Sequence, residues 1–242
     1  MDTDISTVER GYVLCGTART GSTLLSRALR DTGVLGYPQE YFNPRAIALA
    51  PGERYPKTRT AQVAEIFRRG QSDNGVYALK LFADQFDALA GFDWAGRLPN
   101  LHFVTLERRD LLGQAMSWVR ASQSQQWDSD QQALRTPRYD EAAIERALEK
   151  FASERARWQL YFARNGRAPL ALTYEDMAAA LPETIRAIAA LVGVSDLPDD
   201  LPHCSQMQVQ RDDLSEEWRS RFMTTKRDLA RFDRLRRWRF RL

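Results

Sequence analysis

Histidine and cysteine are scarce in this chain of 242 residues, which contains two of each. Cys15 and Cys204 form no framework of paired cysteines, and the histidines are His102 and His203. No cluster of cysteine, histidine or paired carboxylates has the spacing of metal ligands. We therefore expect no bound metal and a chemistry that makes little use of imidazole.

Long hydrophobic runs are also absent. No apolar stretch approaches the roughly 20 residues needed to cross a bilayer, and the first ten residues, MDTDISTVER, are too polar for a secretory signal. Hydrophobic residues make up 43% of the chain and charged residues 28%, as in globular proteins. We expect a cytoplasmic protein without integral membrane association, folded as a single domain over residues 1–242.

The net charge is only +3, but it is unevenly distributed. The chain ends in the basic segment ARFDRLRRWRFRL, in which Phe232, Leu235, Trp238 and Phe240 are interleaved. The solvated face of a final helix, beginning at Ser215, would explain this pattern. A surface for an anionic ligand, a lipid or a nucleic acid would explain it too, and the sequence leaves these readings open.

Short apolar runs alternate with stretches of helical periodicity. Strands are predicted at residues 11–16, 76–82, 101–108 and 169–174, and helices at 22–31, 60–69, 111–122, 140–165 and 181–192. This order predicts an α/β fold with a P-loop-like parallel β-sheet flanked by helices on both sides. Ligands of such folds bind at the carboxyl ends of the strands.

The segment GTARTGST follows the first predicted strand and leads into a helix. Free N–H groups and the helix dipole favour an anion at such a turn. Arg19 adds a cation, and Ser22 and Thr23 add hydroxyl donors. A P-loop kinase or nucleotide hydrolase would carry lysine in place of Ser22, which argues against that class. A tight turn that binds nothing is the alternative.

The segment RRDLLGQAMSW follows the third predicted strand and supplies a second candidate anion site. Arg109 precedes Ser117 by eight residues, so the two side chains can converge on one anion. The alternative is a helix capped by Asp110 with Ser117 in its interior. Two anion sites on neighbouring strands suit a nucleotide with phosphates at both ends of its ribose.

Six blocks of the chain, in order, resemble the sulfotransferases, and most closely the bacterial trehalose 2-sulfotransferase family. They are RTGSTLL, GYPQEYF, LKLFADQ, RRDLLGQAMSW, VRASQSQQW and LSEEW. The fourth block is similar to the family pattern R-x-D-x-x-x-Q-A-x-S. The resemblance covers Val13 to about Phe222. It implies the sulfotransferase fold, 3′-phosphoadenosine 5′-phosphosulfate (PAPS) as donor, the bisphosphate PAP as product, no metal, and a homodimer.

The resemblance also implies roles for individual residues. Arg19 would hold the 5′-phosphate and stabilise the leaving group, Glu40 would be the general base, and Lys80 would contact the transferred sulfonate. The donor nucleotide would contact Arg19, Thr20, Gly21, Ser22, Thr23, Arg109, Ser117 and Tyr174. For Glu40 the alternative is a surface loop position, for Lys80 a salt bridge to a nearby acid, and for Tyr174 core packing.

The residues expected to border the acceptor are Gln39, Gln85, Trp118, Gln123 and Trp127. Amide and indole groups suit a polyhydroxylated ligand, although the tryptophans would serve equally well in a core. The expected function is sulfuryl transfer from PAPS to a hydroxyl of a carbohydrate or glycolipid, with trehalose as a candidate. The alternatives are a P-loop-type nucleotide kinase or hydrolase, or a non-catalytic protein that binds anions or nucleic acid.

Three departures from the family pattern concern the acceptor and the nucleotide. Residues 82–85 read FADQ where the family has a segment of the type M-W-N-Q, and the stretch between Asn43 and Val76 is shorter. The late arginine of the family pattern is displaced by two positions, to Arg211. These departures leave the donor assignment in place and leave the acceptor open.

Overall fold

The computed structural model describes residues 10–47, 51–128, 131–203 and 213–225. Its centre is a sheet of four parallel strands in the order β2-β1-β3-β4. The strands are β1 (Arg10–Gly16), β2 (Val76–Phe82), β3 (Leu101–Glu107) and β4 (Leu170–Thr173). The prediction of an α/β fold with a parallel sheet is confirmed.

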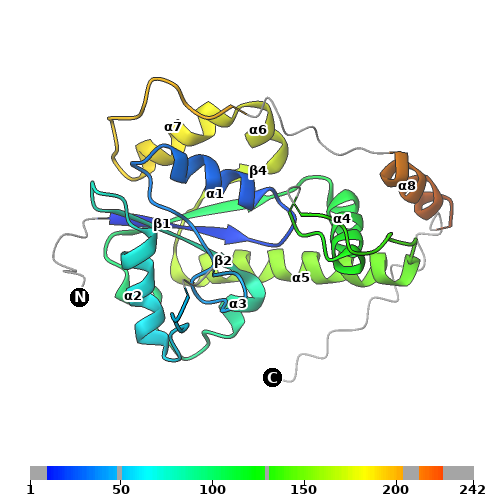
Figure 1. Cartoon of the computed structure of the whole chain (residues 1–242), viewed down its shortest axis with the longest axis horizontal. Coiled ribbons are helices and arrows are strands. Elements are labelled where there is room, and N and C mark those ends of the chain that lie inside the picture. Colours follow the sequence, from blue (N-terminus) through cyan, green and yellow to red (C-terminus); the bar gives the residue numbers. More distant parts are fainter. Residues whose placement is uncertain (1–9, 48–50, 129–130, 204–212, 226–242) are drawn as a thin grey trace.

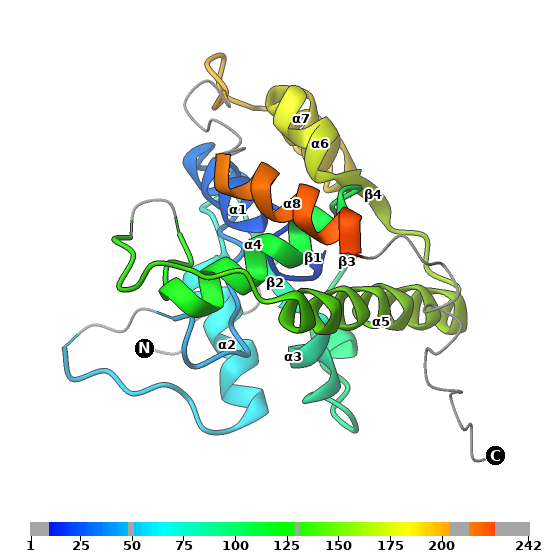
Figure 2. The ribbon, with the colours of Figure 1, turned by 90° about the vertical axis from the view of Figure 1, so that its right-hand side faces the viewer.

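Helices cover both faces of the sheet (Figure 1). On one face lie α1 (Ser22–Asp31), α6 (Tyr174–Ala179) and α7 (Leu181–Leu191). On the other lie α2 (Arg59–Gly70), α3 (Ala83–Asp87) and the long α5 (Glu141–Asn165). A third group, α4 (Leu111–Ser124) with α8 (Asp213–Thr225), packs beside α5 (Figure 2). A short 3₁₀ helix (Ala95–Arg97) precedes β3.

Alternating side chains of β1 supply the two main cores, because successive residues of a strand point to opposite faces. Tyr12 and Leu14 pack with α1 and α7, whereas Val13 and Cys15 pack with α2 and α5. Cys15 is buried as a small apolar residue, as predicted, and burial raises the pKa of its thiol. Cys204 lies outside the described residues.

The four strands end at the same edge of the sheet. Gly16 is paired with Phe82 of β2 and Leu106 of β3, so the loops after these strands begin side by side. Each strand leads into a helix: β1 into α1, β2 into α3, β3 into α4 and β4 into α6. This edge is where the sequence predicted the ligand site.

The remaining predictions of secondary structure were partly right. The short α3 and α6 and the 3₁₀ helix were not predicted, and the last described helix begins at Asp213, two residues before the predicted Ser215. Residues 226–242, which hold the basic tail, and Arg211 lie outside the described residues. Within the described ranges, no helix has both the length and the apolar character of a membrane span.

Candidate active site

The first part of the site is the loop at residues 17–21, between β1 and α1. Two of its residues have a left-handed backbone, Arg19 with φ of 66° and Gly21 with φ of 78°. A β-carbon on Gly21 would lie 2.6 Å from the ring of Tyr174. Both the backbone conformation and the available space therefore require glycine here.

The hydroxyl groups of this loop and of α1 have different surroundings. Thr20 is fully buried, and its hydroxyl donates to the carbonyl oxygen of Thr17 at 3.0 Å, so it stabilises the loop itself. Ser22 is buried and Thr23 is exposed in the first turn of α1. The unpaired N–H groups of a helix N-terminus favour an anion at this position.

Arg19 joins the loop to the region after β3. Its Nε donates to Ser117 Oγ at 2.9 Å, and its Nη1 donates to the carbonyl oxygen of Trp127 at 2.6 Å. Burial lowers the pKa of the Arg19 guanidinium, and the neighbouring positive charge of Arg108 lowers it further. Arg19 and Arg108 therefore bring two neighbouring positive charges to this edge of the sheet.

Arg109 does not meet Ser117 as the sequence predicted. Its guanidinium is exposed and makes two hydrogen bonds to the carboxylate of Asp176, at 2.7 and 2.9 Å. Its backbone N–H donates to Glu175 at 3.0 Å. These bonds hold the end of β3 to the start of α6, and Ser117 accepts its hydrogen bond from Arg19 instead.

Arg108, which the sequence analysis missed, is the arginine nearer the loop. Its guanidinium lies 5.1 Å from the centre of the Tyr174 ring, and this ring also lies against Gly21. Its Nε is buried without a hydrogen-bond partner among the described residues. Arg108 also occupies the first position of the pattern R-x-D-x-x-x-Q-A-x-S, which was the signal available in the sequence.

A second feature that the sequence analysis missed is a buried hydrogen-bond network around Gln114. Gln114 Nε2 donates to Thr17 Oγ1 and to the carbonyl oxygen of Ala18, both at 2.7 Å. Its Oε1 accepts from Arg155 Nη2 at 2.9 Å, and Arg155 also donates to the carbonyl oxygen of Arg108. The network connects the loop after β1, the end of β3, α4 and α5.

The second part of the site is the segment that follows α1 and carries Glu40. Gln39 forms a parallel bridge to Leu79, and its carbonyl oxygen accepts from the backbone N–H of Lys80 at 2.8 Å. The side chain of Lys80 is 9% exposed, and its Nζ lies 3.2 Å from Glu40 Oε1. Glu40 and Lys80, predicted from separate blocks of sequence, therefore meet at the end of β2.

Two amide side chains also contact Glu40. Gln85 Nε2, from α3, donates to Glu40 Oε2 at 2.6 Å. Asn43 Nδ2, three residues after Glu40, donates to the same oxygen at 2.9 Å. Gln85 was expected to border the acceptor, and in the structure its amide nitrogen faces the carboxylate of the predicted base.

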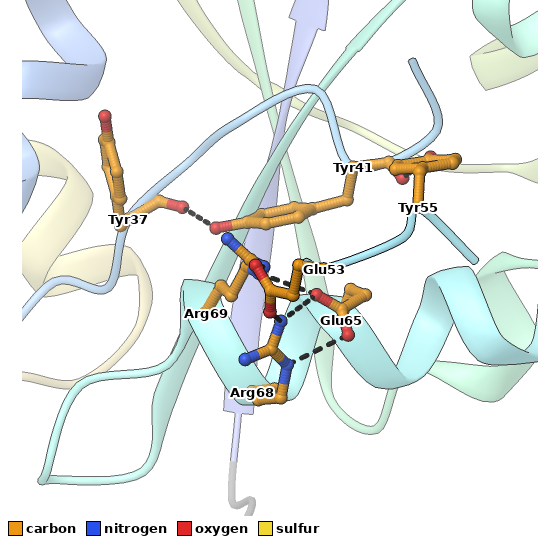
Figure 3. Close-up of polar contacts among 7 residues, drawn as sticks. All are labelled: Tyr37, Tyr41, Glu53, Tyr55, Glu65, Arg68 and Arg69. Carbon is orange, nitrogen blue, oxygen red and sulfur yellow. Dashed lines mark hydrogen bonds and ion pairs between the residues drawn. The ribbon is translucent and has the colours of Figure 1, made fainter. Parts of the chain in front are cut away.

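The segment that bears Glu40 is anchored on α2 (Figure 3). The fully buried Tyr41 donates its hydroxyl to the carbonyl oxygen of Tyr37 at 2.9 Å, and the Tyr55 hydroxyl donates to the carbonyl oxygen of Tyr41. Burial raises the pKa of the Tyr55 phenol to about 12. The adjoining ion pairs join Arg68 and Arg69 to two glutamates, Glu53 and Glu65. These contacts fix the backbone on both sides of Glu40.

The other residues expected at the acceptor are divided between two places. Trp118 and Trp127 form an edge-to-face pair with ring centres 5.1 Å apart, and Trp127 is 41% exposed. The pair is next to Arg19, whose guanidinium binds the Trp127 carbonyl oxygen. Gln123 instead accepts from the backbone N–H of Arg138 at 2.6 Å, in the wall of a surface hollow of about 1050 Å³.

No group of three or more metal-ligating side chains occurs in the described ranges. The cations, hydroxyls and helix N-terminus at this edge are the chemistry that binds phosphate and sulfate groups. The edge thus brings together the loop after β1, which carries Arg19, and a pair formed by Lys80 of β2 with Glu40 of the segment after α1.

Comparison with known proteins agrees with this geometry. The chain is 26% identical over 265 residues to the trehalose 2-sulfotransferase of Mycobacterium tuberculosis (strain ATCC 35801 / TMC 107 / Erdman), covering 90% of this chain and 96% of that protein. It is 25% identical over 254 residues to the trehalose 2-sulfotransferase of Mycolicibacterium smegmatis (strain ATCC 700084 / mc(2)155), covering 87% and 93%. Residues 11–225 match the family model described as Stf0 sulphotransferase, and the chain belongs to this family.

Proposed function

We propose that this protein transfers the sulfuryl group of PAPS to a hydroxyl of a carbohydrate or glycolipid. The observation that carries the proposal is the pairing of Glu40 with Lys80 at the end of β2. The neighbouring strand β1 ends in the loop that bears Arg19. A carboxylate, which would serve as the proton acceptor, and two cations therefore lie at one edge of the sheet.

The donor site would be formed by the loop after β1 and by Arg108 and Tyr174, which lie beside it. Arg19, Ser22 and Thr23 would hold the 5′-phosphosulfate at the N-terminus of α1. Arg108 would meet the 3′-phosphate in place of Arg109, since its Nε lacks an acceptor and an unsatisfied buried N–H is costly. Tyr174, in contact with Arg108, would border the adenine.

The reaction would be an in-line transfer in which the protein moves one proton and neutralises charge. Glu40 would take the proton of the acceptor hydroxyl while the hydroxyl oxygen forms a bond to sulfur. The bond between sulfur and the 5′-phosphate oxygen would break, and its electron pair would stay on the phosphate. Lys80 would stabilise the sulfonate and Arg19 the leaving phosphate, as fixed donors do where charge develops.

The acceptor would lie between Glu40 and the pair Trp118–Trp127, whose rings offer apolar faces to a sugar. Trehalose is the first candidate, because both named relatives are trehalose 2-sulfotransferases. Phe82, Ala83 and Asp84 depart from the family pattern, and Ala83 is fully buried in the core that β1 and β2 share with α2 and α5.

The experiment is detection of sulfated product by mass spectrometry after incubation with PAPS, EDTA and a panel of sugars that includes trehalose. We expect product and an equal amount of PAP from the wild type, and a rate lower by about 10²–10⁴-fold for Glu40→Gln. Glu149→Gln, at an exposed position of α5, is the matched control. The proposal would be refuted if the wild type formed no PAP with any acceptor and also did not bind PAP.

The family resemblance also predicts a homodimer. Sedimentation equilibrium of the wild type, with and without PAP, tests this part separately, and a single species of 27.8 kDa under both conditions would contradict it.

A further inference from the structure

The two oxygens of the Glu40 carboxylate have different surroundings. Oε2 accepts two hydrogen bonds, from Gln85 Nε2 at 2.6 Å and from Asn43 Nδ2 at 2.9 Å. Oε1 has the ammonium group of Lys80 at 3.2 Å. A general base needs an oxygen with a lone pair that remains available to the substrate.

Both amides that contact Oε2 are held at their other end. Asn43 Oδ1 accepts from the backbone N–H of Arg45 at 3.1 Å. Gln85 Oε1 accepts from the backbone N–H of Phe82 at 3.5 Å. A backbone N–H faces each carbonyl oxygen, as a hydrogen bond for Asn43 and as a longer, weaker contact for Gln85, so each NH₂ group is turned toward the carboxylate. The same arrangement thus occurs twice, once from the segment of Glu40 itself and once from α3.

The backbone supports this orientation. The N–H of Asn43 donates to the carbonyl oxygen of Glu40 at 2.8 Å, which makes a turn that brings the amide back to the carboxylate. Gln85 lies three residues beyond the end of the strand that carries Lys80. The amide of Gln85 and the ammonium of Lys80 therefore reach the carboxylate from one continuous stretch of chain.

We propose that Asn43 and Gln85 are positioning residues that hold Glu40 Oε2 and leave Oε1 as the oxygen that takes the acceptor proton. This inference rests on the proposed sulfuryl transfer. In that step the proton of the acceptor hydroxyl passes to Oε1, next to Lys80, which stabilises the sulfonate. Gln85 then acts through Glu40 and not by binding the sugar.

The first test separates positioning from acceptor binding. Gln85→Met keeps the length of the side chain and removes its donor. We expect kcat to fall by about 10- to 100-fold, as for a misplaced catalytic group, with little change in the KM values for donor and acceptor. Gln85→Asn, which keeps an amide, should recover part of kcat, and Gln159→Met on the exposed side of α5 should match the wild type.

The second test does not depend on activity. A double-mutant cycle in urea unfolding compares the effect of Gln85→Met in the wild type and in the Glu40→Ala background. That background lacks the carboxylate oxygen to which Gln85 donates. We expect Gln85→Met to change the unfolding equilibrium constant at least about twofold more in the wild type than in that background. The same cycle with Asn43→Ala tests the other amide.

The outcomes are distinguishable. A wild type that transfers sulfuryl groups while Gln85→Met raises only the acceptor KM would overturn the inference and leave the proposed function intact. Zero coupling in both cycles would overturn it as well. A wild type that forms no product would remove the proposed function, and the catalytic role of the two amides with it. A lower kcat with unchanged KM and a measurable coupling supports it.

Discussion

Arg19 Nε donates to Ser117 Oγ at 2.9 Å, which connects the loop after β1 to the middle of α4. The sequence had placed these two residues in separate anion sites. Because Ser117 holds the guanidinium from one side, Arg19 is oriented before any anion arrives, and less side-chain entropy is lost on binding.

Replacement of Arg19 should weaken binding of PAP, the product of the proposed reaction. Arg19→Lys keeps the charge but loses the planar fork, and Arg19→Met loses both. We expect a Kd about 10-fold higher for the lysine variant and about 100-fold higher for the methionine variant, in the range of hydrogen bonds to charged groups. Isothermal titration calorimetry with PAP measures both. Arg164→Met, at the exposed end of α5, is the control, and equal affinity for all four proteins would contradict the assignment.

The adjacent arginines Arg108 and Arg109 should differ in their effect on nucleotide selectivity. Arg108 lies over Tyr174, whereas Arg109 is bonded to Asp176 at the surface. We expect Arg108→Met to reduce the preference for PAP over AMP by about 10-fold or more, because one charged contact to the 3′-phosphate is lost. Arg109→Met should leave that ratio unchanged. Competition binding with the two nucleotides measures it, and the reverse result would return the role to Arg109.

The fold was predicted well where the pattern is long and weakly where elements are short. The buried runs gave β2 with its observed bounds and β1 and β3 within one residue, because strands covered on both faces are continuously apolar. Helices α3 and α6 have five and six residues, too few for helical periodicity to appear. Both begin directly after a strand, α3 after β2 and α6 after β4.

The site was predicted in its parts but not in its pairings. Sequence blocks singled out Arg19, Glu40 and Lys80, which remain predictions as site residues. Between Arg108 and Arg109 the family pattern points to Arg108, yet the role was assigned to Arg109, and the fold shows which guanidinium lies beside the loop. That choice depends on the position of Tyr174, about 65 residues later in the chain. Likewise, the amide of Gln85 suited a sugar in composition, and only the folded chain brings it to a carboxylate 45 residues away.

Gln114 should be important for stability because it is buried at the centre of a hydrogen-bond network. It is fully buried and bonded to Thr17, Ala18 and Arg155. Gln114→Leu keeps the size but leaves these groups without their partner, at a cost of about 1–3 kcal/mol. Urea unfolding should show this loss, and PAP binding should weaken because the loop after β1 is released. Gln159→Leu on the surface of α5 should show neither effect. Unchanged stability with weaker PAP binding would instead indicate a direct contact with the nucleotide.

An ion pair between the partly exposed Lys150 and the buried Glu154 lies next to Trp118. Glu154, whose side chain is 4% exposed, is paired with Lys150, whose side chain is 34% exposed and whose ammonium lies 5.3 Å from the centre of the Trp118 ring. Burial raises the pKa of Glu154, the hydrogen bond and charge of Lys150 lower it, and the charge of Asp84 raises it, with a net increase above the ordinary value. The folded protein therefore disfavours the charged form of this carboxylate, even with Lys150 beside it.

Replacement of Glu154 and replacement of Lys150 should therefore have different effects on the stability of the protein. Since the pKa of Glu154 is higher in the folded protein, its stabilising contribution is present at low pH and is lost as pH rises through the folded-state value. Glu154→Gln should remove this loss and be at least as stable as the wild type at pH 7, because the partly exposed Lys150 can turn to solvent. Lys150→Met leaves the buried carboxylate unpaired and should cost about 1–3 kcal/mol or more at pH 7.

Urea unfolding of the three proteins at pH 5, 6, 7 and 8 measures both effects. A Glu154→Gln variant that is much less stable than the wild type at pH 7, and more nearly equal to it at pH 5, would mean that the ion pair outweighs desolvation here.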